Sequence, residues 1–424
     1  MPRVLPMDHE LRQILNDELH GRTGSRITAP SRITHMAFTL DQGDGDPREH
    51  VLALAHELGV DLVDPDQLHI NFKIAGGFLR YERHGEFYRI ALIAEGRQPT
   101  GAEALDLVPP QWIEDLPGKR LVAIHTHLIA AKDKTPGDKE LLAYFGHEDI
   151  AASAVSQGQA IIWTDFRIRA DGFSRLLVQD KGLAPLRLGR VTRRLHEIET
   201  YRMMSLLALP LARAVQGELK PLEQELHEVI TSMTEDRPAE FDASLLARLS
   251  IIARKVEELS NRSNYRFAAT RAYAALVEKR IAELNEVRVD SYQRIGVFLD
   301  RRFGPAVATC AAVSSRIERL ATRSERANNL LRTRVDIALE AQNQALLRSM
   351  DKRARQQLLL QETVEGLSVV AISYYLIAIV SKFFEGLGTF EDKTSSTLLH
   401  VIGIPALVLL VWLALRQMKK RAQK

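Results

Sequence analysis

The sequence predicts an α+β N-terminal domain, then a long α-helical, coiled-coil-like stalk, then a C-terminal transmembrane hairpin of two helices. Short apolar runs alternate with turn residues over the first 183 residues, which is typical of strands. From residue 184 the apolar spacing is almost wholly helical. Two uncharged apolar stretches then close the chain. The expected segments are a cytoplasmic α/β domain (1–183), a stalk domain (184–363), a first transmembrane helix (364–384), a short external loop (385–396), a second transmembrane helix (397–416) and a basic cytoplasmic tail (417–424).

Length and composition exclude several classes of protein. The 424 residues are too many for one ordinary domain, and a mean hydropathy of −0.13 excludes a carrier with many spans. The net charge is +3 and basic residues alternate with acidic ones, so we expect no nucleic-acid partner. A single cysteine, Cys310, excludes an intramolecular disulfide framework. No apolar signal-peptide core follows the first methionine, so we expect the soluble part to stay in the cytoplasm.

The N-terminal part contains several apolar runs that predict strands. Asp46 and Pro47 begin a helix between the first two of them. Asp171-Gly172 is a hairpin turn before the last one. The predicted strands are 32–38, 68–74, 78–83, 87–94, 119–129, 160–167 and 173–178.

The stalk has few helix breaks and two apolar seams at heptad spacing. The predicted breaks are Pro210, Gly217 to Pro221, Asp236 to Pro238 and Gly304-Pro305. The seams are Leu245, Leu249, Ile252, Val256 and Leu259, and then Val313, Ile317, Leu320, Ala327, Leu331 and Ala338. An antiparallel pair turning at Gly304-Pro305 would cover part of the second seam within one chain. The rest requires another copy, so we expect a homo-oligomer with cyclic symmetry.

Two uncharged stretches near the C-terminus predict membrane spans. Gly366 to Ser381 covers roughly 24 Å as a helix, and Lys382 and Phe383-Phe384 extend it towards the roughly 30 Å of a hydrocarbon core. Thr397 to Leu415 is the second stretch. Two buried core helices are the alternative. The positive-inside rule places both termini in the cytoplasm because both flanks are basic: Arg348, Lys352, Arg353 and Arg355, and Arg416, Lys419, Lys420, Arg421 and Lys424.

Four polar residues of the head are candidate metal ligands. His125 and His127 lie on one face of a predicted strand and could form half of a site. His196 and Glu199 lie one turn apart on a predicted helix. Structural histidines and ion pairs with nearby arginines are the competing interpretations. No catalytic residue, metal site or cofactor is predicted with a recognisable motif.

The first predicted span contains polar residues that could line a pore or form helix contacts. They are Ser368, Ser373, Tyr374 and Tyr375.

Several strings of residues resemble the DUF3422 family of bacterial membrane-anchored proteins over nearly the whole chain. They are Asp17–Arg22 with Ala29–Arg32, Tyr81–Phe87, Thr164–Arg167 with Asp171–Phe173, Arg194–Met204 with Leu207–Pro210, and Val364–Ser368 with Ser373–Tyr375. The resemblance implies a membrane anchor in the bacterial inner membrane and no known activity or catalytic residues.

The predicted architecture is also similar to that of CorA-type magnesium channels. Those proteins carry a Gly-Met-Asn triplet at the outer end of the first span, where this chain has Ser381 to Gly386 without it. Lys382 near a pore mouth would repel cations. We therefore expect a membrane-anchored structural or regulatory protein that is not an enzyme, with the lipid bilayer as partner. The alternative is a CorA-like homo-oligomeric channel or transporter for a divalent cation, and a membrane-tethered hydrolase or metal enzyme is a third hypothesis.

Overall fold

The computed structural model describes residues 9–12, 16, 26–41, 43–60, 69–234, 239–386 and 399–422. The chain divides into two compact units. Unit 1 comprises Met1–Glu235 with Ala247–Asn328, and unit 2 comprises Asp236–Leu246 with Asn329–Lys424. Unit 1 therefore contains both the strands and a large part of the long helices.

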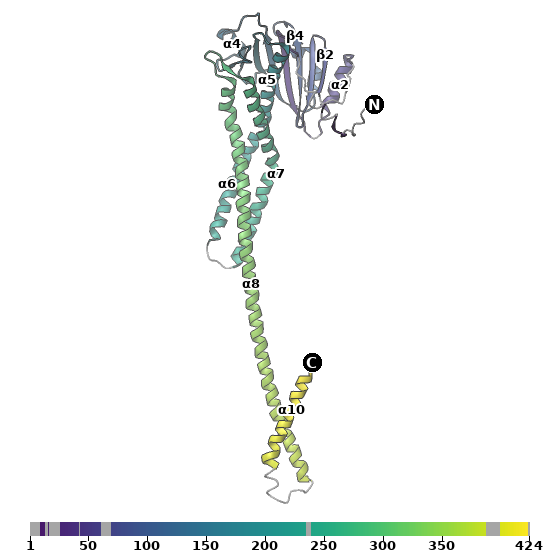
Figure 1. Ribbon diagram of the computed structural model, residues 1–424, viewed down its shortest axis with the longest axis vertical. Coiled ribbons are helices and arrows are strands. Elements are labelled where there is room, and N and C mark those ends of the chain that lie inside the picture. The colour runs from purple at the N-terminus through teal and green to yellow at the C-terminus, as the bar shows by residue number, and fades with distance from the viewer. Residues whose placement is uncertain are drawn as a thin grey trace, which may run out of the picture. The chain divides into compact units, whose positions relative to one another are not determined.

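A nine-stranded sheet forms the core of unit 1 (Figure 1). Its strands follow the order β2-β3-β4-β1-β5-β8-β7-β6-β9, and neighbours are antiparallel except for the parallel pair β5 and β8. The strands are β1 (Ser31–Thr39), β2 (His69–Ile74), β3 (Gly77–Arg83), β4 (Phe87–Glu95), β5 (Lys119–Ile129), β6 (Ala151–Val155), β7 (Ala160–Thr164), β8 (Ser174–Asp180) and β9 (Val287–Arg288).

Helices lie between and after these strands. The shorter ones are α2 (Pro47–Glu57), the 3-10 helix η1 (Ala104–Leu107), α3 (Pro110–Glu114) and α4 (Asp138–Phe145). The longer ones are α5 (Pro185–Leu206), α6 (Ala208–Ser232), α7 (Ala239–Leu284) and α8 (Ile295–Gly386), followed by the π-helix η2 (Leu399–Gly403) and α10 (Ile404–Ala422). The predicted helix start at Asp46-Pro47 is confirmed, and the Asp46 carboxylate caps α2 by accepting a hydrogen bond from the Arg48 amide at 2.9 Å.

Side chains alternate between the two faces along each strand, and helices cover both faces of the sheet. On β1, Ile33 and Ala37 face a core shared with α5, α7 and the start of α8. Met36 and Phe38 face the opposite core, which α2, η1 and α3 cover. A third cluster places α4 against β6, β7 and β8. The sheet and its covering helices α5, α7 and α8 thus share one hydrophobic core.

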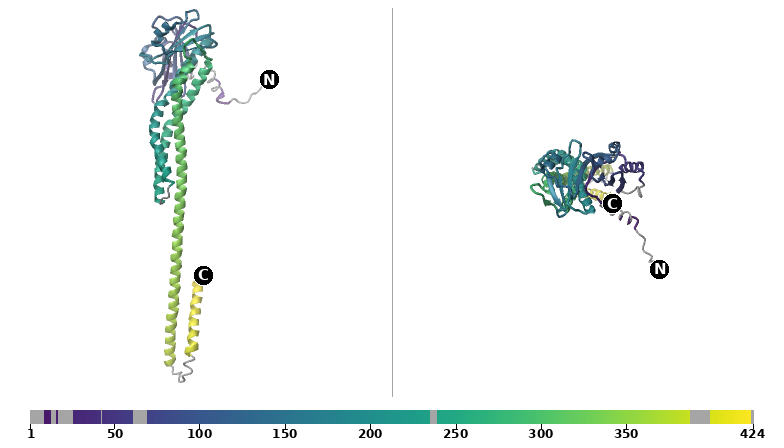
Figure 2. Two further views of the ribbon diagram at one scale, coloured as in Figure 1. Left: turned by 90° about the vertical axis from the view of Figure 1, so that its left-hand side faces the viewer. Right: turned by 90° about the horizontal axis from the view of Figure 1, so that it is seen from above.

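Within unit 1, α6, α7 and the first part of α8 lie side by side (Figures 1 and 2). Ion pairs join them: Arg262 of α7 pairs with Glu218 of α6, and Arg316 Nη2 of α8 lies 2.7 Å from Glu223 Oε2 of α6. Within unit 1 the predicted seam residues are buried, namely Leu249, Ile252, Val256, Leu259, Val313, Ile317, Leu320 and Ala327, whereas Ala338 in unit 2 is only half-buried. Helix α6 adds a third buried seam. Its residues are Leu219, Leu222, Leu226 and Val229. The predicted seams of unit 1 are therefore covered within one chain.

The predicted break at Gly304-Pro305 is wrong. Helix α8 begins ten residues earlier, at Ile295, and continues through Pro305 to Gly386. Phe303 is buried in the shared core, so packing offsets the backbone hydrogen bond that proline removes. The chain reverses instead at residues 285–294, where Asn285 and Asp290 adopt left-handed φ values of 49° and 42°.

Other helix and strand ends also differ from those predicted. Pro210 and Pro221 lie inside α6, and the junction with α5 is at Leu207. The break predicted at Asp236 to Pro238 falls outside the described residues. Strand β7 ends at Thr164 because Phe166 has a left-handed φ of 53°. Strands β6 and β9 and helices α3 and α4 were not predicted from the sequence.

Unit 2 contains most of α8 and the C-terminal helices. Leu245 and Leu331 are buried, whereas most large apolar side chains of α8 after Leu331 are exposed. They include Ile337, Leu339, Leu346, Leu347, Leu358, Leu359 and Leu360.

Candidate functional site

Polar side chains form one layer between the sheet and α5. In the strand register, Glu82 of β3 lies opposite Arg89 of β4, and Arg80 lies opposite Ala91. Ala91 in turn lies opposite His35 of β1. Side chains alternate between the two faces along a strand, and residues directly opposite each other on neighbouring strands point to the same face. These five side chains therefore lie on one face of the sheet.

The face of α5 that covers this layer is polar as well. It carries Gly189, Thr192, Arg193 and His196, at positions i, i+3, i+4 and i+7 of the helix. This spacing puts all four residues on one side of a helix. The first turn of α5 is held by the segment before β1, because the Ile27 amide donates to the Pro185 carbonyl at 3.2 Å.

Arg89 is the centre of a buried ion network. Its Nε donates to Glu82 Oε2 at 2.5 Å, and its Nη2 lies 3.5 Å from Glu197 Oε1 on α5. Glu197 also accepts from Arg193 Nε at 2.9 Å and from Arg280 Nε of α7 at 2.5 Å. Two carboxylates and three guanidinium groups thus connect β3, β4, α5 and α7.

The network shifts the titration of its members. Burial alone would raise the pKa of Glu82, but Arg89 and Arg193 outweigh it and lower that pKa to about 2. The pKa of Glu197 is lowered in the same way, against burial, by Arg89, Arg193 and Arg280. The pKa of Arg89 is raised, since Glu82 and Glu197 outweigh the effect of its burial. All three groups are therefore charged at neutral pH.

Two stacked histidines lie beside this network. The rings of His35 and His196 are 4.6 Å apart and nearly parallel. The Thr200 hydroxyl donates to the His196 carbonyl at 2.8 Å, so it accepts the hydrogen bond of 3.0 Å from His35 Nε2. His196 Nε2 bonds to the Thr126 hydroxyl at 2.8 Å.

Both imidazoles are neutral at physiological pH. Burial, followed by the charge of Arg89, lowers the pKa of His196 to about 3. Burial likewise holds the pKa of His35 well below its usual value. A neutral, hydrogen-bonded pair of this kind fixes the helix on the sheet.

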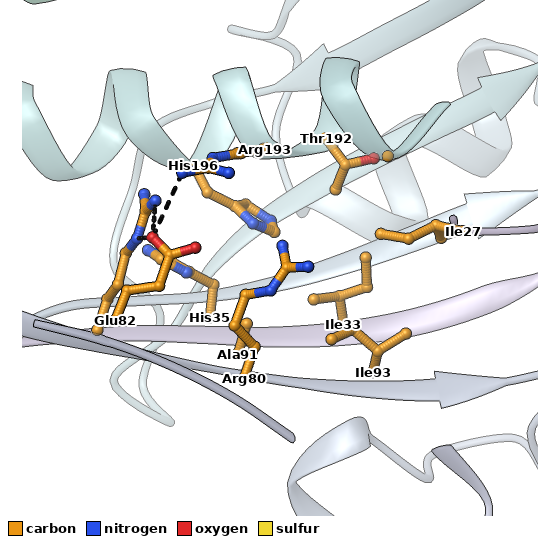
Figure 3. Close-up of a pocket in the computed structure, with 12 residues that line it drawn as sticks. Ile27, Ile33, His35, Arg80, Glu82, Ala91, Ile93, Thr192, Arg193 and His196 are labelled. Carbon is orange, nitrogen blue, oxygen red and sulfur yellow. Dashed lines mark hydrogen bonds and ion pairs between the residues drawn. The ribbon is translucent and has the colours of Figure 1, made fainter. Parts of the chain in front are cut away.

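A small cavity of about 30 Å³ lies within the layer (Figure 3). The cavity exists because Ala91 in the sheet and Gly189 in α5 are smaller than the other residues that line it. Figure 3 shows the Arg80 side chain extending from the sheet towards α5, between the histidines and Ile33. A volume of this size holds about one or two water molecules.

The predicted metal candidates on β5 belong to a different environment. His125 and His127 lie on the same face, as expected, but the opposite one from Thr126. His127 Nε2 bonds to both Glu103 oxygens at 3.0 Å, and His125 Nδ1 bonds to the Thr34 hydroxyl at 2.9 Å. Burial lowers the pKa of His125 to about 4.

The second candidate pair does not come together. His196 faces Thr126 in the polar layer, whereas Glu199 forms an ion pair with Arg202 at 2.6 Å. Among the residues that the structure describes, no group of three His, Cys, Asp or Glu side chains is arranged to hold a metal ion. Hydrogen bonds and ion pairs are the observed roles of these four residues.

The polar residues of the predicted first span lie on α8. Tyr374 and Tyr375 are exposed, and their rings are 5.8 Å apart. The Ser368 hydroxyl donates to the Val364 carbonyl at 2.8 Å, and Ser373 is buried. Ser368 therefore satisfies its hydroxyl within its own helix.

The comparison with protein families decides the relationship that the motifs predicted. The family described as "Protein of unknown function (DUF3422)" matches residues 7–422. The chain belongs to the DUF3422 family. The predicted resemblance is thereby confirmed over nearly the whole chain, and comparison with curated proteins gave no match.

The polar layer of this DUF3422 protein was not predicted as a site. Two of the strings that identified the family nevertheless contribute to it, since Tyr81–Phe87 contains Glu82 and Arg194–Met204 contains His196 and Glu197. The sequence feature that could have revealed this layer is a charged residue inside an otherwise apolar predicted strand. Arg89 stands among the apolar residues of β4, and such a residue needs a buried partner.

The shifted pKa of Glu82 predicts a pH dependence of stability. A carboxylate whose folded pKa is about 2, against 4.5 ordinarily, stabilises the fold above pH 4.5 and loses that effect as the pH falls towards 2. We expect Glu82→Gln to lower the free energy of unfolding at neutral pH, and the difference from the natural protein to shrink to near zero by pH 2. Urea unfolding at stepped pH measures this difference.

The exposed Glu95 on β4 provides the matched control. Glu95→Gln should follow the natural protein across the whole range. A difference between Glu82→Gln and the natural protein that stays constant from pH 7 to pH 2 would contradict the buried ion network.

Proposed function

We propose that this DUF3422 protein is a membrane-anchored structural or regulatory protein, without catalytic activity, whose head lies in the cytoplasm. The observation that carries the proposal is on α8, which is long and apolar enough to cross a membrane. One 18-residue window of this helix has a mean hydropathy of 1.8, and 6% of that window is buried. Leu367, Val370 and Ile379 are each more than 60% exposed, and an uncovered apolar surface of this kind needs an apolar solvent.

The second half of the proposed anchor is α10. Val401–Ala414 is a shorter apolar stretch within η2 and α10. The Arg416 guanidinium lies 5.0 Å from the centre of the Trp412 ring, and this pair of residue types is typical of a membrane–water interface. A hairpin of α8 and α10 would bring both basic flanks to the same side. The loop expected at 385–396 lies almost wholly outside the described residues.

The proposed orientation places both termini in the cytoplasm of a bacterium, with the hairpin in the inner membrane. The basic flanks support it, because Arg348, Lys352, Arg353 and Arg355 precede the apolar part of α8 and a second basic cluster follows that of α10.

Removal of residues 365–424 should release the protein from the membrane. The remaining chain lacks the apolar part of α8, and we expect it in the soluble fraction after a high-salt wash, whereas the full chain should stay with the membranes through alkaline carbonate. Immunoblotting of the fractions measures this. Alkaline phosphatase fused after Lys424 should be inactive, and a fluorescent protein fused there should fluoresce.

Two results would contradict the proposed anchor. The first is a shortened chain that remains in the membrane after the salt wash. The second is an active phosphatase fusion at the C-terminus, which would place that end outside the cytoplasm.

We also propose that the protein is a homo-oligomer. The support lies in α8 beyond Leu331, where the apolar side chains Leu339, Leu346, Leu358 and Leu359 are exposed. A single helix with exposed leucines gains stability by burying them against an equivalent helix. A CorA-like channel is the alternative function, and it requires the same oligomer. The exposed Lys382 near the end of α8 disfavours it, because a ring of lysines repels cations.

The oligomer predicts a mass well above the 47.7 kDa of one chain. Light scattering of the full chain in a nonionic detergent, corrected for bound detergent, measures it. Leu346→Gln with Leu359→Gln should lower the mass towards one chain, whereas Gln342→Ala with Gln356→Ala should not. A single species of one chain across a wide concentration range would exclude both the oligomer and the channel.

A further inference from the structure

A second cavity of unit 1 lies between the segment that follows β7, the C-terminal half of α5 and the first turns of α8. Its volume is about 170 Å³, and its apolar lining consists of Phe166, Leu206, Phe298, Leu299 and Phe303. Three of these side chains, Phe298, Leu299 and Phe303, are buried and form the floor. Since an apolar cavity of about 150 Å³ can bind benzene, this one has room for a single six-membered ring.

One aromatic side chain of this cavity is held in a strained backbone conformation. Phe166 has a left-handed φ of 53°, which residues other than glycine rarely adopt. The buried Asp165 carboxylate fixes the turn, because it accepts hydrogen bonds from the Arg167 amide at 3.1 Å and from Arg169 Nη2 at 2.8 Å. The Phe166 ring stacks on that of Phe298, with the ring centres 5.5 Å apart. Strained residues that their surroundings hold in place concentrate at ligand sites.

Two arginines at the mouth of the cavity share one carboxylate. Arg167 and Arg302 are exposed, and their Nη2 atoms lie 3.3 and 3.0 Å from the same oxygen of Asp149, Oδ2. In the described part of the chain, neither guanidinium group has another ion pair. Because a guanidinium group has five N–H donors, the two arginines retain donors for a second carboxylate. The Arg302 guanidinium lies 3.9 Å from the centre of the Phe298 ring, so its charge borders the aromatic floor.

The other charged side chains of the cavity are paired one to one. Asp165 lies 2.8 Å from Arg169, and Arg202 lies 2.6 Å from Glu199. Together with the shared carboxylate at the mouth, the cavity and its paired neighbours contain four guanidinium groups and three carboxylates. This excess of one positive charge matches a ligand with one negative charge.

We infer that this cavity binds an aromatic monocarboxylate with a single ring. The ring lies among Phe166, Phe298 and Phe303, where it gains contacts with other aromatic rings. The carboxylate accepts hydrogen bonds from Arg167 and Arg302, whose planar groups match its two oxygens. The inference does not rest on the membrane anchor, because every residue involved lies in unit 1.

Benzoate is the probe that tests the inference. With the full chain in a nonionic detergent at neutral pH, isothermal titration calorimetry measures benzoate binding, and chloride keeps the ionic strength constant. We expect saturable binding. Benzamide keeps the ring but has no charge, and it should bind at least about tenfold more weakly. Cyclohexanecarboxylate keeps the charge but has no planar ring, and it should also bind more weakly than benzoate. Saturation-transfer NMR of the benzoate protons measures binding independently.

Two variants of the cavity separate binding from folding. Arg302→Gln should weaken benzoate binding about tenfold or more, as expected for the loss of hydrogen bonds from a charged group. Its unfolding temperature without ligand should change little, because an exposed ion pair such as that with Asp149 contributes little to stability. Leu206→Phe fills the cavity with another ring and should abolish binding with both arginines intact. Arg301→Gln is the matched control: Arg301 is the exposed neighbour of Arg302 on α8 but does not line the cavity, so benzoate binding should stay unchanged.

Any of four results overturns the inference. The first two are the absence of saturable benzoate binding to the natural protein and equal benzoate affinity of Arg302→Gln. The third is an affinity for benzamide or cyclohexanecarboxylate that equals the affinity for benzoate. The fourth is unchanged benzoate binding by Leu206→Phe, which would place the bound benzoate outside this cavity.

Discussion

The attachment of α5 to the sheet depends on one buried cation. Arg89 lies on a central strand with 5% of its surface exposed, and it contacts a carboxylate of the neighbouring strand and one of α5. A buried guanidinium is tolerated only where it is paired and hydrogen-bonded. Glu197 meets this requirement for Arg89 and at the same time holds Arg280 of α7. The position of both helices on the sheet is thereby set by charge as well as by hydrophobic contact.

The same interaction explains the chemistry of the rest of the layer. Deep burial, followed by the charge of Arg89, lowers the pKa of His196 and keeps it neutral, so it stacks on His35 and bonds to Thr126 instead of forming an ion pair. Glu82 and Glu197 are fully used by their arginines. Arg80, two residues before Glu82 on the same face of β3, lines the cavity beside this network.

The sequence predicted the strands well where turn residues separate apolar runs, as in β1 to β5. It failed where packing overrides local preference: α8 passes through Pro305 because its flanks are buried, and the true reversal at Asn285 contains neither glycine nor proline. It also missed the polar layer, because Glu197 lies 108 residues from Arg89 in the chain and only the packing of α5 on the sheet brings the two together. His125 and His127 were placed correctly on one face, but their partner Glu103 comes from a helix cap that no spacing could reveal.

Hydrogen–deuterium exchange of Arg89→Leu in the full chain tests the central claim most directly, with Arg97→Leu, an exposed arginine paired with Asp133, as control. Loss of Arg89 leaves Glu82 and Glu197 with fewer partners, and breaking a buried pair costs about 3–5 kcal/mol. Amides of α5 and of β3 and β4 should therefore exchange at least about tenfold faster, while those of β6 and β7 change little. Unchanged protection of α5 in Arg89→Leu would contradict the claim that this cation fixes the helix on the sheet.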